Sequence, residues 1–229
     1  MRFEDLTWRE VEGYLAKRKD VLIPLGSTEE HGHHLPISTD AVIAERLCEK
    51  ASEVTGVVVA PIIKYGVCRS TAGYPGTISV SLNGLREFVY DVMEGLSQQG
   101  FTTFYLVTGH GGGAHRVAIE EAAVRVKARE GVRIYLFNPY DVDLSDLVTA
   151  NDAHAGEVET SLMLYLEPES VHMEKAVDDE AKKGVEVRSD WRPTKSGVFG
   201  KSKLATKKKG EFIFKRFVTS VVDLIKGAQ

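Results

Sequence analysis

Short runs of apolar residues, many of them β-branched or aromatic, alternate along the chain with longer segments in which apolar residues recur every three or four positions. The short runs predict strands and the longer segments predict amphipathic helices. The run at 104–107 is continuously hydrophobic, which is typical of a strand buried on both faces. The pattern therefore predicts an α/β fold with a mostly parallel sheet flanked by helices. The expected strands are 21–25, 57–61, 103–108 and 132–137, and the expected helices are 6–18, 41–54, 82–99, 114–130, 158–166 and 212–226.

Nothing in the sequence divides the chain into parts. It contains no internal repeat, no low-complexity tract and no compositional shift that would mark a linker. Its length suits one α/β domain, and we expect a single domain over 1–229. The stretch 178–210 fits neither pattern and is expected to be irregular, as lids and partner-binding loops often are. Five lysines lie within 201–209, where the composition favours a solvated loop over a phosphate-binding patch.

The composition is that of an ordinary globular protein, with 43% hydrophobic and 27% charged residues. No apolar run approaches the roughly 18–20 residues that a membrane helix requires. The first ten residues carry charges where a signal peptide would be apolar, so we expect a cytoplasmic protein without membrane contact. A net charge of −4 gives no electrostatic reason to bind nucleic acid. The two cysteines, Cys48 and Cys68, predict neither a disulfide framework nor a thiolate metal site, and are expected as reduced thiols in or near the core.

The first candidate site is the segment 26–40, which follows a predicted strand and precedes a predicted helix. Ligand sites of open α/β folds form at this carboxyl edge of the sheet. Glu29 and His31 point to the same side if the segment is extended, and Asp40 lies at the start of the helix. Nitrogen and oxygen ligands without sulfur suit Zn, Mn or Fe(II). The alternative is that Asp40 only caps the helix and the histidines are polar loop residues.

The second candidate site is His110, which ends a predicted strand and is followed by three glycines and a helix. Free N–H groups at a helix start favour an anion or a developing oxyanion, so Gly111 and Gly112 are expected to contact the substrate. A rival interpretation is the dinucleotide fingerprint G-x-G-x-x-A, which 109–114 matches. Against it, the match is not in the first strand-to-helix turn, and no acidic residue follows the next strand.

The third candidate site runs from a loop into a helix and contains His154, Glu157 and Glu159. The first turn of a helix favours carboxylates, so either glutamate alone needs no further function. Beside His154, and with two other histidine clusters in the chain, they indicate a site.

Together the three segments resemble the creatininase family. The matching stretches are 25–40, Thr-Gly-His-Gly-Gly from Thr108, and 154–164, in that order, with Gly-Tyr-Pro-Gly-Thr-Ile-Ser at 73–79 after the first. The resemblance implies a three-layer α/β/α sandwich and a homo-oligomer. It also implies two divalent metal ions per chain (Zn, Fe(II) or Mn) and hydrolysis of a C–N amide bond other than a peptide bond.

By the same resemblance, Glu29 and His110 would hold one metal, His31 would hold the other, and Asp40 would bridge them. His154 would transfer a proton to the leaving nitrogen, a task that suits the pKa range of histidine. No G-x-S-x-G motif is present, which disfavours an acyl-enzyme route.

The sequence departs from creatinine-cleaving members at two places. In those enzymes the resemblance implies an aromatic residue and a glutamate after the motif histidine, and the glutamate is a ligand of the second metal. This chain has Gly111 and Gly112 at these two positions. Either Glu159 or water would then complete that metal site. A tryptophan that walls the creatinine pocket corresponds to Ala150, which argues against a flat slot for creatinine.

The glycine-rich second motif resembles another branch, the archaeal formamide hydrolases of flavin and deazaflavin coenzyme biosynthesis. The best prediction is hydrolysis of the formamide of 2-amino-5-formylamino-6-ribosylaminopyrimidin-4(3H)-one 5'-monophosphate, with release of formate. Its phosphate would be received by Lys64, Arg69, Arg116 or the lysine-rich segment. Creatinine or another cyclic amide is the alternative substrate. A non-catalytic metal-binding module is the alternative of a different class, although closed structural sites usually have four Cys or His ligands.

Overall fold

A computed structural model of the chain describes residues 1–127, 130–149, 152–180 and 192–228. Its centre is a four-stranded parallel sheet, as the sequence predicts, with the strands in the order β2-β1-β3-β4. The inner strands β1 and β3 are buried along their whole length, whereas the edge strand β4 is mostly half-buried. The strands are β1 (Asp20–Leu25), β2 (Val58–Val59), β3 (Thr103–Thr108) and β4 (Arg133–Phe137).

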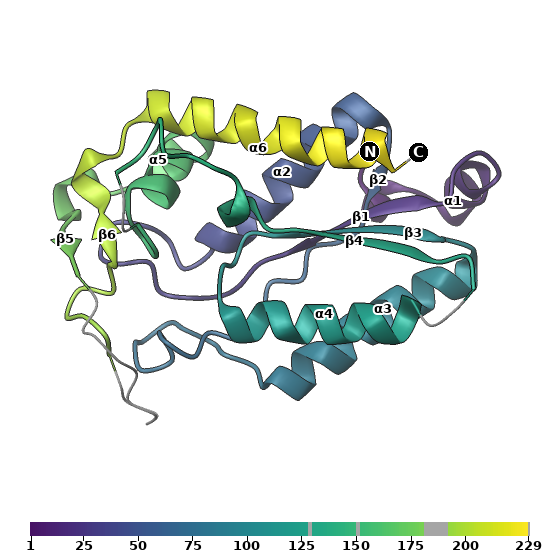
Figure 1. Cartoon of the computed structure of the whole chain (residues 1–229), viewed down its shortest axis with the longest axis horizontal. Helices are drawn as coiled ribbons and strands as arrows, with labels where there is room; N and C mark the ends of the chain where they lie inside the picture. Colours follow the sequence, from purple (N-terminus) through teal and green to yellow (C-terminus); the bar gives the residue numbers. More distant parts are fainter. Residues whose placement is uncertain (128–129, 150–151, 181–191, 229) are drawn as a thin grey trace.

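Helices cover both faces of this sheet, which gives the expected three-layer arrangement (Figure 1). Successive side chains of a strand point to opposite faces, so Leu22 and Tyr105 pack into one apolar core, and Ile23 and Phe104 into the other. The helices on the first face are α2 (Thr39–Thr55), α5 (Glu157–Leu166) and α6 (Lys207–Gly227), and those on the second are α3 (Leu82–Gln99) and α4 (Gly113–Lys127). Residues 128–129, the last part of the predicted helix 114–130, lie outside the described residues.

The remaining elements are short. The helix α1 (Trp8–Leu15) precedes β1, and its Tyr14 and Leu15 pack against the core of the second face. Two strands of two residues each form a small antiparallel sheet within the stretch expected to be irregular. The short elements are η1 (Phe3–Asp5), η2 (Pro139–Asp141), η3 (Pro168–Ser170), η4 (Met173–Lys175), β5 (Asp178–Asp179), β6 (Gly200–Lys201) and η5 (Ser202–Leu204). Residues 181–191 of the expected irregular stretch lie outside the described part.

The lysine-rich segment differs from the expectation of a solvated loop. Helix α6 begins at Lys207, so its last three lysines are helical. Thr206 caps the helix by accepting a hydrogen bond from the Lys209 N–H at 3.2 Å, and the Lys209 ammonium forms an ion pair with the buried Glu157. The prediction was wrong there because a lysine run has no apolar periodicity, whereas a cap and a buried partner stabilise the helix.

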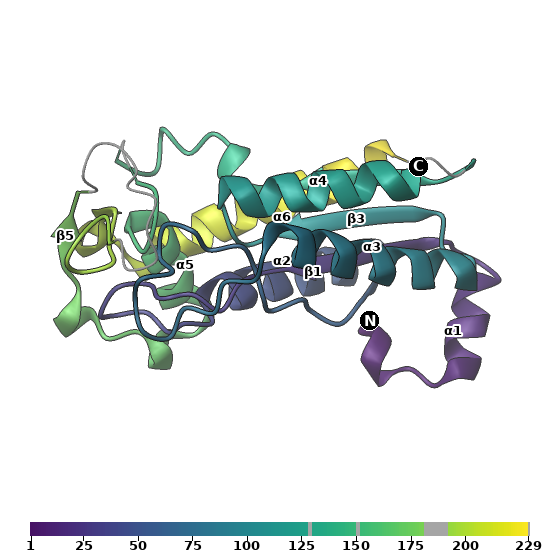
Figure 2. The same cartoon turned by 90° about the horizontal axis from the view of Figure 1, so that it is seen from below.

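The segments that follow β1 and β3 and the segment that precedes α5 meet at the carboxyl edge of the sheet, on the left in Figure 1. Both chain termini and α1 lie at the opposite end, and Figure 2 shows the same separation from below. Within the described ranges, no helix is long and apolar enough to cross a membrane. The fold thus brings the three candidate segments to one end of the molecule.

Candidate metal centre

Side chains from all three candidate segments are buried together at the carboxyl edge of the sheet. Glu29 and His31 lie in the segment after β1, and Asp40 lies in the first turn of α2, as expected. His110 lies in the loop after β3, and Glu159 lies in the first turn of α5. All five are at most 6% exposed. Residues far apart in the sequence therefore form one polar cluster inside the protein.

The first half of the cluster is arranged around the His110 ring. Its Nδ1 lies 2.9 Å from Oε2 of Glu29 and 2.8 Å from Oδ2 of Asp40. The Sγ of Cys68 joins this half: ligand atoms of Glu29, Cys68 and His110 lie within 4.8 Å of one another. This is the spacing at which a single cation can be shared by several donors.

The second half is arranged around the His31 ring. Its Nε2 lies 2.9 Å from Oδ1 of Asp40 and 3.6 Å from Oε2 of Glu159. His154 is also in this half, with ligand atoms of His31, His154 and Glu159 within 4.8 Å of one another. Asp40 thus contacts His31 through one carboxylate oxygen and His110 through the other, the position expected of a bridging ligand.

Hydroxyl groups that the sequence did not single out hold the carboxylates. Ser27 donates a hydrogen bond to Oδ2 of Asp40 at 2.7 Å, and Thr71 donates one to Glu29. Tyr140 donates to Oε1 of Glu159 at 2.8 Å. Such outer partners orient metal ligands, and their removal commonly weakens metal binding. In the sequence, Ser27 is marked only by its position after a predicted strand. No sequence feature marks Thr71 or Tyr140.

The buried carboxylates of the cluster require a positive countercharge. Buried carboxylates need a compensating partner, yet among the described residues Glu29, Asp40 and Glu159 form ion pairs with imidazoles and with no lysine or arginine. Burial lowers the pKa of His31, but the charges of Asp40 and Glu159 outweigh it and raise this pKa to about 10. Burial raises the pKa of Glu29, but the charge of His110 lowers it to about 2.

This donor set fits a pair of divalent cations. Carboxylates and imidazoles are the ligands that Zn, Mn and Fe(II) share. Bound cations would supply the countercharge that protonated His31 and His110 supply without them. Creatininase structures of similar fold are described with manganese and with zinc. In the described part of this chain, two groups of buried ligand-type side chains could each hold a metal ion.

The two glycines after His110 serve the cluster in a way that the sequence did not reveal. A Cβ at Gly112 would lie 2.4 Å from Nε2 of His110, so a side chain there is incompatible with this ring position. A Cβ at Gly111 would lie 3.2 Å from the Tyr140 ring. Oε2 of Glu159 lies 3.6 Å from Nε2 of His31 and offers a carboxylate to the second half of the cluster. Contact of the two glycines with substrate stays a prediction.

The cations expected to receive a phosphate lie in different surroundings. Arg69 is exposed and directly follows Cys68 of the cluster. Arg116 forms ion pairs with Glu120 and Asp141. Ala150, expected in place of a pocket tryptophan, lies outside the described residues.

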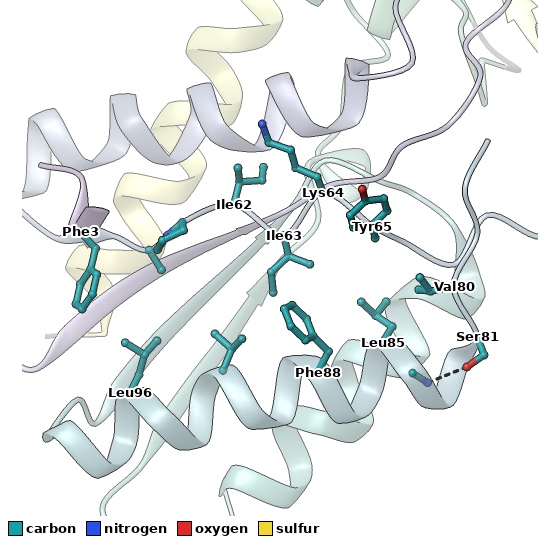
Figure 3. A pocket seen from close by; sticks show the side chains of 14 residues that line it. Phe3, Ile62, Ile63, Lys64, Tyr65, Val80, Ser81, Leu85, Phe88 and Leu96 are labelled. Carbon is teal, nitrogen blue, oxygen red and sulfur yellow. Dashed lines mark hydrogen bonds between the residues drawn. The ribbon is translucent and has the colours of Figure 1, made fainter. Parts of the chain in front are cut away.

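Lys64 lines a different feature, an apolar groove of about 870 Å³ between α3 and the segment that follows β2 (Figure 3). Phe88, Leu85 and Tyr65 also line this groove, and no residue of the polar cluster does. The Lys64 carbonyl accepts a hydrogen bond from the hydroxyl of Thr28, the neighbour of Glu29, at 2.8 Å. Which of these cations receives a phosphate stays a prediction.

Comparisons with known proteins agree with this geometry. The profile of the family described as "Creatininase: Creatinine amidohydrolase" matches residues 4–225. The chain is 32% identical over 219 residues to a mycofactocin precursor peptide peptidase of Mycolicibacterium smegmatis, covering 90% of this chain and 84% of the relative. It is 26% identical to a creatinine amidohydrolase of Pseudomonas putida, covering 97% and 95% of the two chains. A manganese-bound creatininase structure superimposes with a TM-score of 0.89 at 25% identity, covering 99% of this chain and 98% of that one.

Proposed function

The chain belongs to the creatininase family and is a hydrolase of amide C–N bonds, and from this premise we propose which residues carry the reaction and which amide is cleaved. The observation that carries the proposal is Asp40, whose two oxygens contact the histidines of both halves of the cluster. Glu29 and His110 would hold one cation, His31 and Glu159 the other, and Asp40 both. When bound, such a pair lowers the pKa of water and polarises an amide carbonyl.

His154 is the residue that we propose for proton transfer to the leaving nitrogen. Its Nε2 hydrogen-bonds the Glu30 carbonyl at 2.8 Å, and its ring centre lies 4.3 Å from that of His31. Burial and the charge of His31 lower the pKa of His154, but the Glu30 carboxylate, 3.4 Å from Nε2, and the charge of Glu29 outweigh them and raise it. Histidine has the pKa range that such a proton transfer requires.

Ser27 is not placed to act as a nucleophile. Its hydroxyl is fully buried and donates its proton to Asp40. A serine acts as a nucleophile when a neighbouring base accepts its proton and its oxygen is exposed to the substrate. Direct attack by water is therefore the route that the geometry supports.

We propose the formamide of a formylamino-pyrimidine ribonucleotide phosphate as the substrate. Positions 111 and 112 are glycines, so they lack the aromatic and acidic side chains expected there for creatinine cleavage. Arg69, exposed beside the cluster, offers a cation for the phosphate. A second candidate is a peptide amide, favoured by the 32% identity to a mycofactocin precursor peptide peptidase.

A formate-release assay tests the proposed substrate. The purified protein is reconstituted with Mn, Zn or Fe(II) and given the formylamino-pyrimidine nucleotide, creatinine or a short peptide in parallel. We expect formate from the nucleotide and no turnover of creatinine, and Arg69→Ala should raise KM more than it lowers kcat. Cleavage of the peptide without formate release would replace the deformylase proposal with the second candidate.

A further inference from the structure

The thiol of Cys68 lies in the first half of the metal centre and has no role in the ligand set proposed above. Cys68 is 1% exposed and lies in the segment between β2 and α3. Its Sγ, a nitrogen of His110 and a carboxylate oxygen of Glu29 are within 4.8 Å of one another. Both cysteines are free and buried, as expected, but Cys68 also lies beside ligand-type side chains.

The orientation of the neighbouring imidazole points to metal binding. Nε2 of His110 lies 3.2 Å from the carbonyl oxygen of Val67, to which it donates when protonated. That bond leaves Nδ1 directed at Glu29 and Asp40. A ligating histidine almost always donates its other ring N–H in this way, which fixes the tautomer and the ring. Because Val67 directly precedes Cys68, the same stretch of backbone orients the imidazole and delivers the thiol.

The backbone at Cys68 is itself held in place. The Cys68 N–H donates to Oγ of Ser79 at 2.9 Å, and the Val67 N–H donates to Nδ1 of His115 at 3.4 Å. Gly66 also pairs with Ser79 in a parallel bridge. The thiol is thus presented by a fixed segment.

The other cysteine shows what a merely buried thiol looks like in this fold. Cys48 is 0% exposed, lies within α2, and packs in the apolar core of the first face. It belongs to no group of ligand-type side chains in the described part of the chain. Burial alone therefore does not distinguish Cys68; its contact with Glu29 and His110 does.

From this geometry, and resting on the proposed metal centre, we infer that Cys68 is a ligand of the cation held by Glu29 and His110. On binding, the S–H proton passes to solvent and the sulfur donates its lone pair to the cation. Thiolate sulfur is a soft ligand that favours Zn²⁺, Co²⁺ or Fe²⁺ over Mn²⁺ and Mg²⁺. The second half, with His31, His154 and Glu159, offers only nitrogen and oxygen. The two halves therefore differ in metal preference, and the first half takes the softer ion.

Cobalt spectroscopy tests this inference without reference to turnover. The full-length protein is freed of metal with a chelator and titrated with Co²⁺. We expect a thiolate-to-cobalt charge-transfer band in the near ultraviolet, which is lost in Cys68→Ser and kept in the matched control Cys48→Ser. Circular dichroism of each variant checks that it is folded. In a competition of Zn²⁺ against Mn²⁺, Cys68→Ser should weaken Zn²⁺ binding by about 10–100-fold and change Mn²⁺ binding far less.

The outcomes separate the inference from the metal centre on which it rests. Cobalt bound by the wild-type protein without the charge-transfer band overturns the role of Cys68 and leaves the metal centre standing. A folded Cys68→Ser variant that keeps the band overturns the role of Cys68 in the same way. No cobalt bound at all by the wild-type protein overturns both.

Discussion

The two edges of the central sheet neutralise buried carboxylates in different ways. At the amino edge, Asp20 accepts two hydrogen bonds from the Arg18 guanidinium, at 3.0 and 2.7 Å, and one from Tyr14 at 2.8 Å. At the carboxyl edge, Asp40 and Glu29 face imidazoles and hydroxyls. One edge has a permanent cation built into the chain. The other has groups whose charge depends on a proton or on a bound metal.

This difference indicates which charges serve the fold and which serve the chemistry. Burial raises the pKa of Asp20, but the hydrogen bonds from Arg18 and Tyr14 outweigh it and keep the pKa below its usual value. At the carboxyl edge the carboxylates instead raise the pKa of His31 to about 10. An arginine cannot leave its partner, whereas a proton on His31 can be replaced by a cation. The carboxyl edge is therefore the exchangeable site.

The largest effect that would sharpen this comparison is expected from Asp40→Asn. Each Asp40 oxygen contacts a histidine of a different half, so the change weakens both cation sites at once. We expect loss of most bound metal and a fall in turnover of more than about 100-fold. Metal analysis and rate measurement check it, with Asp20→Asn as the control that removes a carboxylate from the opposite edge. Metal content near wild type in Asp40→Asn would remove the bridging role.

A smaller loss is expected from His154→Ala. If His154 transfers a proton, turnover should fall by about 10²–10⁴-fold while metal content stays close to that of the wild type. The same variant should flatten the limb of the pH–rate profile that reports the acid. His154 is also within 4.8 Å of the donor atoms of His31 and Glu159. Loss of one metal from the variant would therefore make it a ligand and contradict the proton-transfer assignment.

The pH dependence of stability should differ between metal-free and metal-loaded protein. The pKa of His31 is raised from 6.5 to about 10, so its stabilising contribution is fully present below the unfolded value and is lost as pH rises through the folded one. The free energy of unfolding of chelated protein should thus fall by a few kcal/mol between about pH 7 and pH 10. Bound metal replaces the proton and should remove this fall. Urea denaturation at a series of pH values, with and without chelator, measures this fall. Equal slopes of the free energy of unfolding against pH would show that protons and metal do not compete at His31.

The smallest effect is expected at the amino edge. Arg18→Met removes the cation beside Asp20. The Arg18 side chain is partly exposed, so solvent screens the ion pair that is lost. We expect a decrease in the free energy of unfolding of about 1–2 kcal/mol, or roughly 2–8 °C in Tm for a chain of this size. Metal content and turnover should not change. A change in metal content or turnover would show that the amino edge also supports the chemistry at the carboxyl edge.

The sequence predicted the fold well where local signals agree with tertiary packing. The strand β3 (Thr103–Thr108) and the helix α3 (Leu82–Gln99) have the predicted bounds, because a continuous hydrophobic run and a closing glycine mark them. Gly100 caps α3 with φ 112°, a backbone conformation that suits glycine. β2 is only Val58–Val59, shorter than predicted, and the chain pairs with β1 again at a single bridge between Ile63 and Leu25.

The site was predicted in part for a similar reason. Glu29, His31 and His110 follow strands whose carboxyl ends meet at one edge, so their proximity follows from topology. Cys68 and Thr71 come from a segment without regular structure, and no spacing rule places such a segment. Their proximity to His110 and Glu29 arises only when the chain folds back over the cluster.

The metal content of the purified wild-type protein shows whether the carboxyl edge holds a pair of cations. Elemental analysis per folded chain, repeated after dialysis against a weak chelator, measures how many cations the carboxyl edge retains. We expect about two divalent ions per chain, one for each half of the cluster that shares Asp40. Protein that is folded but holds no divalent ion, even after incubation with Zn²⁺, Mn²⁺ or Fe²⁺, would contradict it.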